Sequence, residues 1–242
     1  MLGENDRKYL QQVKQQIVFG CNVCHGSGVD CPCQELYAME IRKAQAEIPI
    51  KYRNFTLETI NSPVARPARD KVEKYIHSLA EKRKTGDGLF LWSESKGTAK
   101  TAFGCILLLQ ALEKGYSTYF TTLGKCVDRT AEGWYDDVKK EEFKQHILET
   151  DFLLIDDIGG GEIKTRGNRE LTETTFTTLF RDRCNALLPT IMTSNLHPQD
   201  LQSDYGERLF SIACEHLSTI ECAGPDFRRE VIAKQKRERA NE

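Results

Sequence analysis

The 242-residue sequence lacks a long hydrophobic run and carries almost no net charge. Its longest apolar stretch lies within residues 102 to 112, whereas a membrane-spanning helix needs about 20 such residues. The start of the chain, MLGENDRKYL, is too polar for a signal peptide. A formal net charge of -2 gives the whole molecule no attraction for nucleic acid or membrane. We therefore expect a cytoplasmic protein that has no membrane contact and that meets nucleic acid only through a local surface.

A disulfide framework is also unexpected, because the nine cysteines are an odd number and a cytoplasmic compartment is reducing. Four of them fall within residues 21 to 33 as C-x2-C, a six-residue gap and C-x-C. Two close pairs can deliver four thiolates to one tetrahedral ion, an arrangement that Zn²⁺ prefers. The alternative is a redox pair or four free thiols. The spacing predicts a closed zinc site made by Cys21, Cys24, Cys31 and Cys33, with His25 as a neighbour.

Helix candidates flank this cluster at residues 4 to 17 and 35 to 48. A module this small has little apolar core, so we expect the metal to hold it folded. A closed tetrathiolate leaves no open position for a substrate. We therefore expect residues 1–50 to form a zinc-binding module that binds another protein. A linker with turn and breaker residues is expected at 51–65.

Apolar strand candidates alternate with helix candidates in the remaining residues, 66–242. The strands are expected at 88–93, 117–123, 151–156, 188–194 and 217–222, and helices at about 100–115, 138–149 and 169–186. A strand that is nearly all apolar, such as FLLID, needs cover on both faces. A parallel sheet between helical layers provides this cover. The sequence predicts an α/β domain of that architecture.

The octapeptide ESKGTAKT, residues 94 to 101, follows the first strand candidate and is typical of a phosphate-binding loop. Lys100 suits the β- and γ-phosphates and Thr101 suits Mg²⁺, but Glu94 and Ala99 stand where the motif has glycines. A Cβ in the left-handed region costs about 1 kcal/mol. We expect weaker binding of ATP with Mg²⁺, through residues Ser95, Lys96, Gly97, Thr98, Ala99, Lys100, Thr101 and Ala102.

Two further apolar strand candidates each have polar residues at their carboxyl ends. DFLLIDDIG carries Asp156, expected to hold Mg²⁺, and Asp157, expected to activate water. TIMTSNL ends in Thr193, Ser194 and Asn195, at the carboxyl edge where ligands bind in open α/β sheets. The alternatives are an acidic pair that caps a buried strand and an ordinary turn.

The order of these motifs resembles the DnaC/DnaI-type replicative helicase loaders, which are AAA+ P-loop NTPases related to the IstB transposition helpers. The resemblance covers about residues 52 to 230, and it implies an AAA+ fold. LLIDDIG resembles the Walker B strand, and TSN resembles sensor 1, which implies that Asn195 lies near the γ-phosphate and the attacking water. GPDFRR resembles sensor 2, which implies phosphate contacts from Arg228 or Arg229.

In GERLFSIACEHL, Arg208 matches the first arginine of the family's box VII pattern, whereas Ile212 replaces the second, the usual arginine finger. Losing a finger slows hydrolysis and spares binding. Arg208 is therefore the expected catalytic arginine, with Arg181 and then Arg183 as substitutes; each of them could instead form a surface ion pair.

The resemblance also implies partners. DnaI-like loaders carry a metal-binding module that grips the helicase, and the basic loop after Walker B implies single-stranded DNA contacts from Lys164, Arg166 and Arg169. That loop could equally be solvated. We expect an oligomeric, ATP-dependent loader of a DnaB-type helicase onto single-stranded DNA, with weak or partner-stimulated ATPase activity. The alternatives are an ATP-locked assembly factor that does not hydrolyse ATP, and an IstB-like transposition helper.

Overall fold

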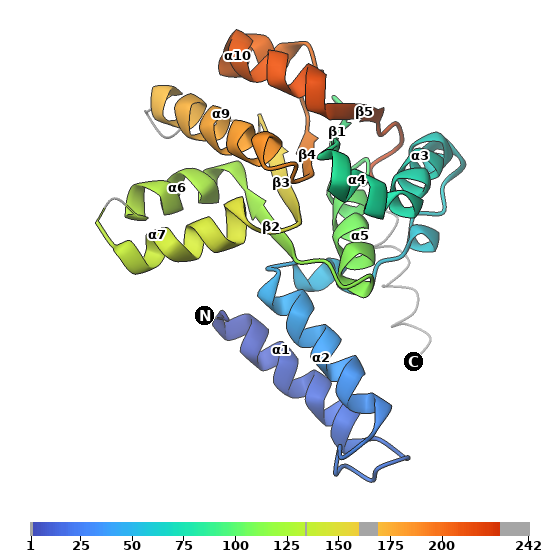
Figure 1. Ribbon diagram of the computed structural model, residues 1–242. Coiled ribbons are helices and arrows are strands. Elements are labelled where there is room, and N and C mark those ends of the chain that lie inside the picture. Colours follow the sequence, from blue (N-terminus) through green and yellow to red (C-terminus); the bar gives the residue numbers. More distant parts are fainter. Residues whose placement is uncertain (1, 134, 160–168, 228–242) are drawn as a thin grey trace.

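The computed structural model describes residues 2–133, 135–159 and 169–227. Its centre is a parallel sheet of five strands in the order β2-β3-β4-β1-β5 (Figure 1). The strands are β1 (Gly88–Trp92), β2 (Thr118–Thr122), β3 (Phe152–Ile158), β4 (Thr190–Ser194) and β5 (Leu217–Glu221). All five lie where the sequence predicts them.

Helices cover both faces of the sheet, and alternate strand residues enter two separate cores. Leu89 and Leu91 pack with α3 (Arg66–His77) and α5 (Lys100–Glu113). Phe90 packs on the other face with α6 (Leu123–Gly133), α9 (Arg169–Asn185) and α10 (Asp200–His216). Short helices α4 (Leu79–Thr85) and α7 (Asp137–Phe143) complete the layers, and a π-helical turn, η5 (Lys144–Leu148), follows α7.

Helices α6 and α10 are not among the helices that the sequence predicts. Helix α6 begins at Leu123, directly after β2, so no turn residue marks the change of structure. Helix α10 contains Gly206 in a non-helical conformation (φ 86°, ψ 159°), and a glycine inside a helical pattern weakens the local preference for helix. Phe176 and Phe180 of α9, four residues apart on one helix face, are fully buried.

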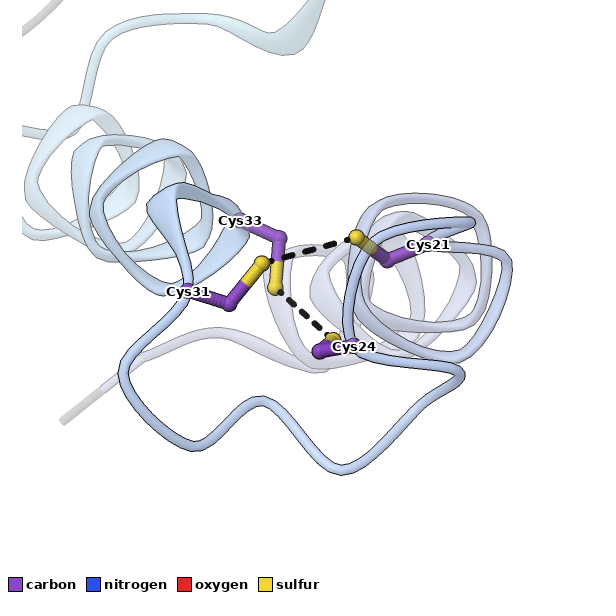
Figure 2. Close-up of side chains that lie close together, drawn as sticks. All are labelled: Cys21, Cys24, Cys31 and Cys33. Atoms are coloured by element: carbon purple, nitrogen blue, oxygen red, sulfur yellow. Dashed lines mark hydrogen bonds between the residues drawn. The ribbon is translucent and has the colours of Figure 1, made fainter.

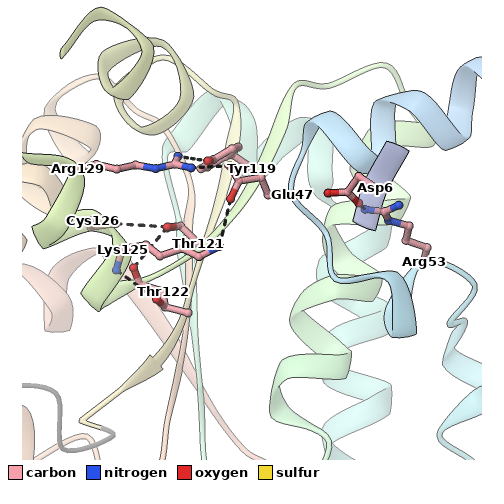
Figure 3. Close-up of polar contacts among 9 residues, drawn as sticks. All are labelled: Asp6, Glu47, Arg53, Tyr119, Thr121, Thr122, Lys125, Cys126 and Arg129. Atoms are coloured by element: carbon pink, nitrogen blue, oxygen red, sulfur yellow. Dashed lines mark hydrogen bonds and ion pairs between the residues drawn. The ribbon is translucent and has the colours of Figure 1, made fainter. Parts of the chain in front are cut away.

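The N-terminal module is a hairpin of α1 (Glu4–Lys14), a π-helical turn, η1 (Gln15–Phe19), and α2 (Pro32–Gln45). Its far end holds the four clustered cysteines around a small core that includes Val18. Its near end contacts β2, where the Phe120 amide donates to the Ala46 carbonyl at 2.8 Å. Glu47 accepts from Lys125 (3.3 Å) and Arg129 (2.5 Å) of α6 (Figure 3).

The segment predicted as a linker, 51–65, is packed against the rest of the fold. Ile60 and Ala65 belong to the core around α5. Arg53 is 2% exposed, and its guanidinium donates to the Ile48 carbonyl and to Asp6 of α1 (Figure 3). This segment therefore joins the module to the α/β domain through buried contacts, while the domain boundaries themselves stay a prediction. Among the described residues, no helix combines the length and apolar character needed to cross a membrane.

Candidate nucleotide site and metal centre

The phosphate-loop candidate connects β1 to α5 and has the backbone shape that its motif requires. Ala99 adopts φ 65° and ψ 11°, the left-handed conformation that the sequence predicts for the missing glycine. Lys100 is 8% exposed. Its ammonium donates to the carbonyls of Ser93 (3.1 Å) and Ser95 (2.9 Å) and to the Thr98 hydroxyl (3.3 Å). The lysine therefore lies along the inside of the loop, where it can exchange backbone oxygens for phosphate oxygens.

Gly97 is needed because another segment approaches the loop closely. It has φ 78°, and a Cβ there would lie 1.9 Å from an Asp226 carboxylate oxygen. The Phe227 amide also donates to the Gly97 carbonyl at 3.0 Å. Residues 226 and 227 thus pack on the loop, directly before the predicted sensor 2 arginines. Glu94 is exposed, which is the orientation in which its charge is least harmful to phosphate binding.

The two residues predicted to hold Mg²⁺ lie together. The Thr101 hydroxyl, from the first turn of α5, donates to Asp156 Oδ1 at 2.8 Å. Burial raises the pKa of Asp156, and hydrogen bonds from Thr193 and Thr101 oppose this rise. A hydroxyl and a carboxylate are the oxygen ligands that Mg²⁺ takes when it also binds phosphates. The donor set therefore fits the predicted ion.

Asp157 points elsewhere because β3 is irregular at this position. The β3–β4 register shifts between Ile155 and Ile158, and Asp157 has φ 60°. Its carboxylate accepts from the Asn195 side-chain amide at 3.2 Å. The structure thus brings the predicted catalytic pair together at the carboxyl edge of the sheet, one residue from the predicted Mg²⁺ ligand.

The three candidate arginines have different surroundings. Arg208 is exposed on α10, and with Arg181 of α9 it lines a surface cavity of about 520 Å³. None of the loop residues 94–101 lines this cavity. Arg183 is fully buried, and burial lowers its pKa. The prediction of Arg183 as a substitute finger is wrong, because its guanidinium donates to Thr190 Oγ1 (3.0 Å) and to the carbonyls of Ile147 (2.7 Å), Thr150 (3.0 Å), Pro189 (2.9 Å) and Asp151 (3.5 Å).

The four clustered cysteines converge at the far end of the module (Figure 2). Their sulfur atoms all lie within 4.8 Å of one another. The closest contacts join Cys21 to Cys31 and Cys24 to Cys33, each at 3.6 Å. The Gly28 amide donates to Cys24 Sγ at 3.3 Å, and this hydrogen bond is the main cause that lowers the pKa of Cys24 to about 6. Four thiols at this spacing, one of them readily ionised, fit a tetrahedral Zn²⁺.

Some predicted site residues cannot be placed. Lys164, Arg166, Arg228 and Arg229 lie outside the described residues, and Arg169 opens α9 without a described side chain. Their DNA and phosphate contacts stay predictions.

No family model matches the sequence, and no curated protein is significantly similar to it. Solved structures do share its architecture. The DnaC helicase loader is 21% identical with a TM-score of 0.61, and the match covers 72% of this chain and 99% of that one. A DNA replication initiation factor is 23% identical with a TM-score of 0.61, over 78% of this chain and 55% of that one. The replication initiator DnaA bound to AMPPCP and single-stranded DNA is 24% identical with a TM-score of 0.61, over 80% of this chain and 56% of that one.

The chain shares the fold of these DnaC and DnaA structures, a parallel sheet between helical layers. This confirms the predicted fold class and the predicted likeness to the DnaC/DnaI-type loaders. The chain spans just over half the length of the initiator structures, at 55% and 56%, and nearly the whole of the DnaC structure. Within this fold, β4 separates β1, which leads into the predicted phosphate loop, from β3, which carries Asp156. The candidate nucleotide site is therefore assembled from three adjacent strands and the first turn of α5.

Proposed function

We propose that this protein is an ATP-dependent loader of a DnaB-type replicative helicase onto single-stranded DNA in replication initiation. The observation that carries the proposal is the combination of two features in one chain. An AAA+ core holds a Lys100 loop and a Thr101–Asp156 pair, and a four-cysteine module is packed against that core. A helicase loader and a DnaA initiator share the fold, and the DnaA structure holds a nucleotide analogue and single-stranded DNA.

ATP is the proposed nucleotide, held with Mg²⁺. Lys100 would move its ammonium from the loop carbonyls to the β- and γ-phosphates, and Thr101 with Asp156 would hold the ion. Bound Mg²⁺ neutralises charge that develops on the phosphate oxygens. Asp157 and Asn195 lie in contact with each other, and they would orient the attacking water. We propose slow hydrolysis, because Ala99 is strained and Ile212 replaces the expected second arginine.

The cysteine module is the proposed contact for the helicase. A metal ion held by four thiolates has no open coordination position for a substrate, so a catalytic role is not proposed for it. Large apolar side chains are exposed in the segments around the four cysteines. Isolated exposed apolar residues are ordinary, but several in one short segment mark an interaction site. Their exposed fractions are 60% for Phe19, 78% for Val23, 73% for Val29 and 60% for Leu36.

The nucleotide part of the proposal is tested by equilibrium binding of a fluorescent ATP analogue with Mg²⁺. We expect the full-length protein to bind and Lys100→Ala to lose binding at least tenfold, because a charge-assisted phosphate contact contributes about 1.5–3 kcal/mol. Lys84→Ala, an exposed lysine on α4, is the matched control and should bind normally. Equal affinity of Lys100→Ala and the control would place the nucleotide elsewhere.

The partner part is tested by capture of the purified hexameric DnaB-type helicase of the source organism on the immobilised full-length protein. Phe19→Ser combined with Val23→Ser should abolish capture. Val64→Ser combined with Val138→Ser removes two other exposed side chains (54% and 69%) and should leave capture intact. Capture that survives the first pair would remove this surface from the proposal.

A second candidate, an ATP-locked assembly factor, is favoured by the strained Ala99 and by Ile212. In such a factor, nucleotide would only order an interface between subunits. Steady-state phosphate release with single-stranded DNA and helicase present separates the two: continuous turnover supports the loader, and release of at most one phosphate per chain supports the assembly factor. An IstB-like helper would instead require assembly on duplex DNA.

A further inference from the structure

Thr193, on β4, contacts both members of the acidic pair through one hydroxyl. Its side-chain oxygen donates to Asp156 Oδ1 at 2.5 Å and accepts from the Asp157 amide at 3.0 Å. The residue is 2% exposed, so water does not compete for these two hydrogen bonds. A single buried hydroxyl therefore fixes a side chain and a backbone group at the same time.

The backbone that Thr193 holds is a β-bulge. In a regular strand, side chains alternate between the two faces, so Asp157 would follow Ile155 into the apolar core beneath α9 and α10. Instead, the register shifts, and Ile155 and Ile158 both enter that core. Asp157 is left exposed at the edge of the sheet with φ 60°. The bulge thus keeps a carboxylate out of the core and turns it toward Asn195.

The left-handed backbone conformation of Asp157 needs support from neighbouring residues. A non-glycine residue in the left-handed region is strained and persists only where its surroundings fix it. The described contacts that fix Asp157 are the hydrogen bond from its amide to Thr193 and the one from Asn195 to its carboxylate. Asp156, on the other side of the same peptide, is fixed by Thr193 and Thr101.

We propose that Thr193 is a positioning residue: its hydroxyl holds Asp156 toward the magnesium position and maintains the bulge that turns Asp157 toward Asn195. The inference rests on the proposed nucleotide function and adds a residue to it. Thr193 itself is not expected to touch nucleotide, since its hydroxyl is already engaged by the two aspartates. Its effect should therefore appear in magnesium dependence and in turnover.

Thr193→Val tests this role, because valine keeps the shape of threonine and removes the hydroxyl. We expect the Mg²⁺ concentration that half-saturates nucleotide binding to rise about tenfold and kcat to fall at least tenfold, while KM for MgATP at saturating Mg²⁺ changes less than threefold. Thr193→Ser keeps the hydroxyl and should restore both quantities to within about threefold of the wild type.

Thr118→Val is the matched control. Thr118 is also a buried strand threonine, at 7% exposure, but its hydroxyl has no hydrogen-bond partner among the residues that the structure describes. The same substitution there should leave magnesium dependence and turnover unchanged. If Thr193→Val also leaves both unchanged while the wild type binds MgATP, Thr193 has no positioning role and the proposed function stands. A folded wild type that binds no nucleotide with Mg²⁺ overturns the proposed function and this inference with it. A serine variant as defective as the valine variant likewise overturns the hydroxyl's role.

Discussion

Replacing Arg183 by methionine should reduce the free energy of unfolding by several kcal/mol. The side chain is fully buried, and its hydrogen bonds within the described part of the chain are to carbonyls and one hydroxyl, with no carboxylate among them. It joins two parts of the chain that are distant in sequence, the connection from η5 to β3 and the start of β4. Methionine fills much of the same volume but can donate no hydrogen bond.

The size of the stability loss follows from the carbonyl groups that lose their hydrogen-bond donor when methionine replaces Arg183. Hydrogen bonds to a charged group contribute about 1.5–3 kcal/mol each, and burying the guanidinium costs several kcal/mol in return. The Pro189 carbonyl keeps a partner, the Leu153 amide at 3.3 Å. The carbonyls of Ile147 and Thr150 lose the donor described for them, at about 1–3 kcal/mol each. We therefore expect a net loss of about 4 kcal/mol, a large part of the 5–15 kcal/mol that is typical of folded proteins.

Urea unfolding followed by far-UV circular dichroism measures this loss. Arg181→Met is the matched control, because Arg181 is only partly buried and its one described ion pair, with Asp182, is 3.8 Å long. That control should change stability by less than about 0.5 kcal/mol. A loss below about 1.5 kcal/mol for Arg183→Met would refute the structural role, as would normal stability with abolished ATP turnover, which would restore Arg183 as a catalytic candidate.

Three further outcomes are expected. Ala99→Gly should tighten MgATP binding about fivefold, measured by fluorescence titration, because it removes about 1 kcal/mol of left-handed strain; unchanged affinity would show that the loop has adapted to alanine. Asp157→Asn should keep ATP affinity within about threefold and abolish phosphate release, so that continued turnover would assign water activation to another group. Cys33→Ser should lose a zinc ligand, so metal analysis should find well below one zinc ion per chain and helicase capture should fall. A full zinc content in this variant would exclude Cys33 as a ligand.

Much of the fold could be predicted because its signals are local. Strands β1, β3 and β4 contain short apolar runs, and the Lys-Thr pair and the two aspartates follow two of these runs. Thr193 could be predicted only as one of the polar residues at the end of a strand. Its role could not be predicted, because its hydrogen bonds to two aspartates 36 and 37 residues away depend on how β3 and β4 pair.

Arg183 and Arg53 show the same limit of sequence-based prediction. Each is an arginine in a polar stretch, where a surface position is the ordinary expectation. Both are buried because acceptors far along the chain complete their hydrogen bonds: the Ile147 carbonyl for Arg183 and the Asp6 carboxylate for Arg53. Spacing alone cannot distinguish an arginine that binds phosphate from one that joins segments of the fold.

The hydrogen bond between Phe120 and Ala46 has a practical consequence for dividing the protein into fragments. Strand β2 is an outer strand of the sheet, and the end of α2 shields part of its otherwise open backbone. Uncovered outer strands pair with other chains and promote aggregation. A fragment that starts after residue 50 would expose this strand and break the contacts of Glu47 with α6. Poor solubility of such a fragment would therefore reflect a missing cover over β2 and would say nothing about the stability of the nucleotide site.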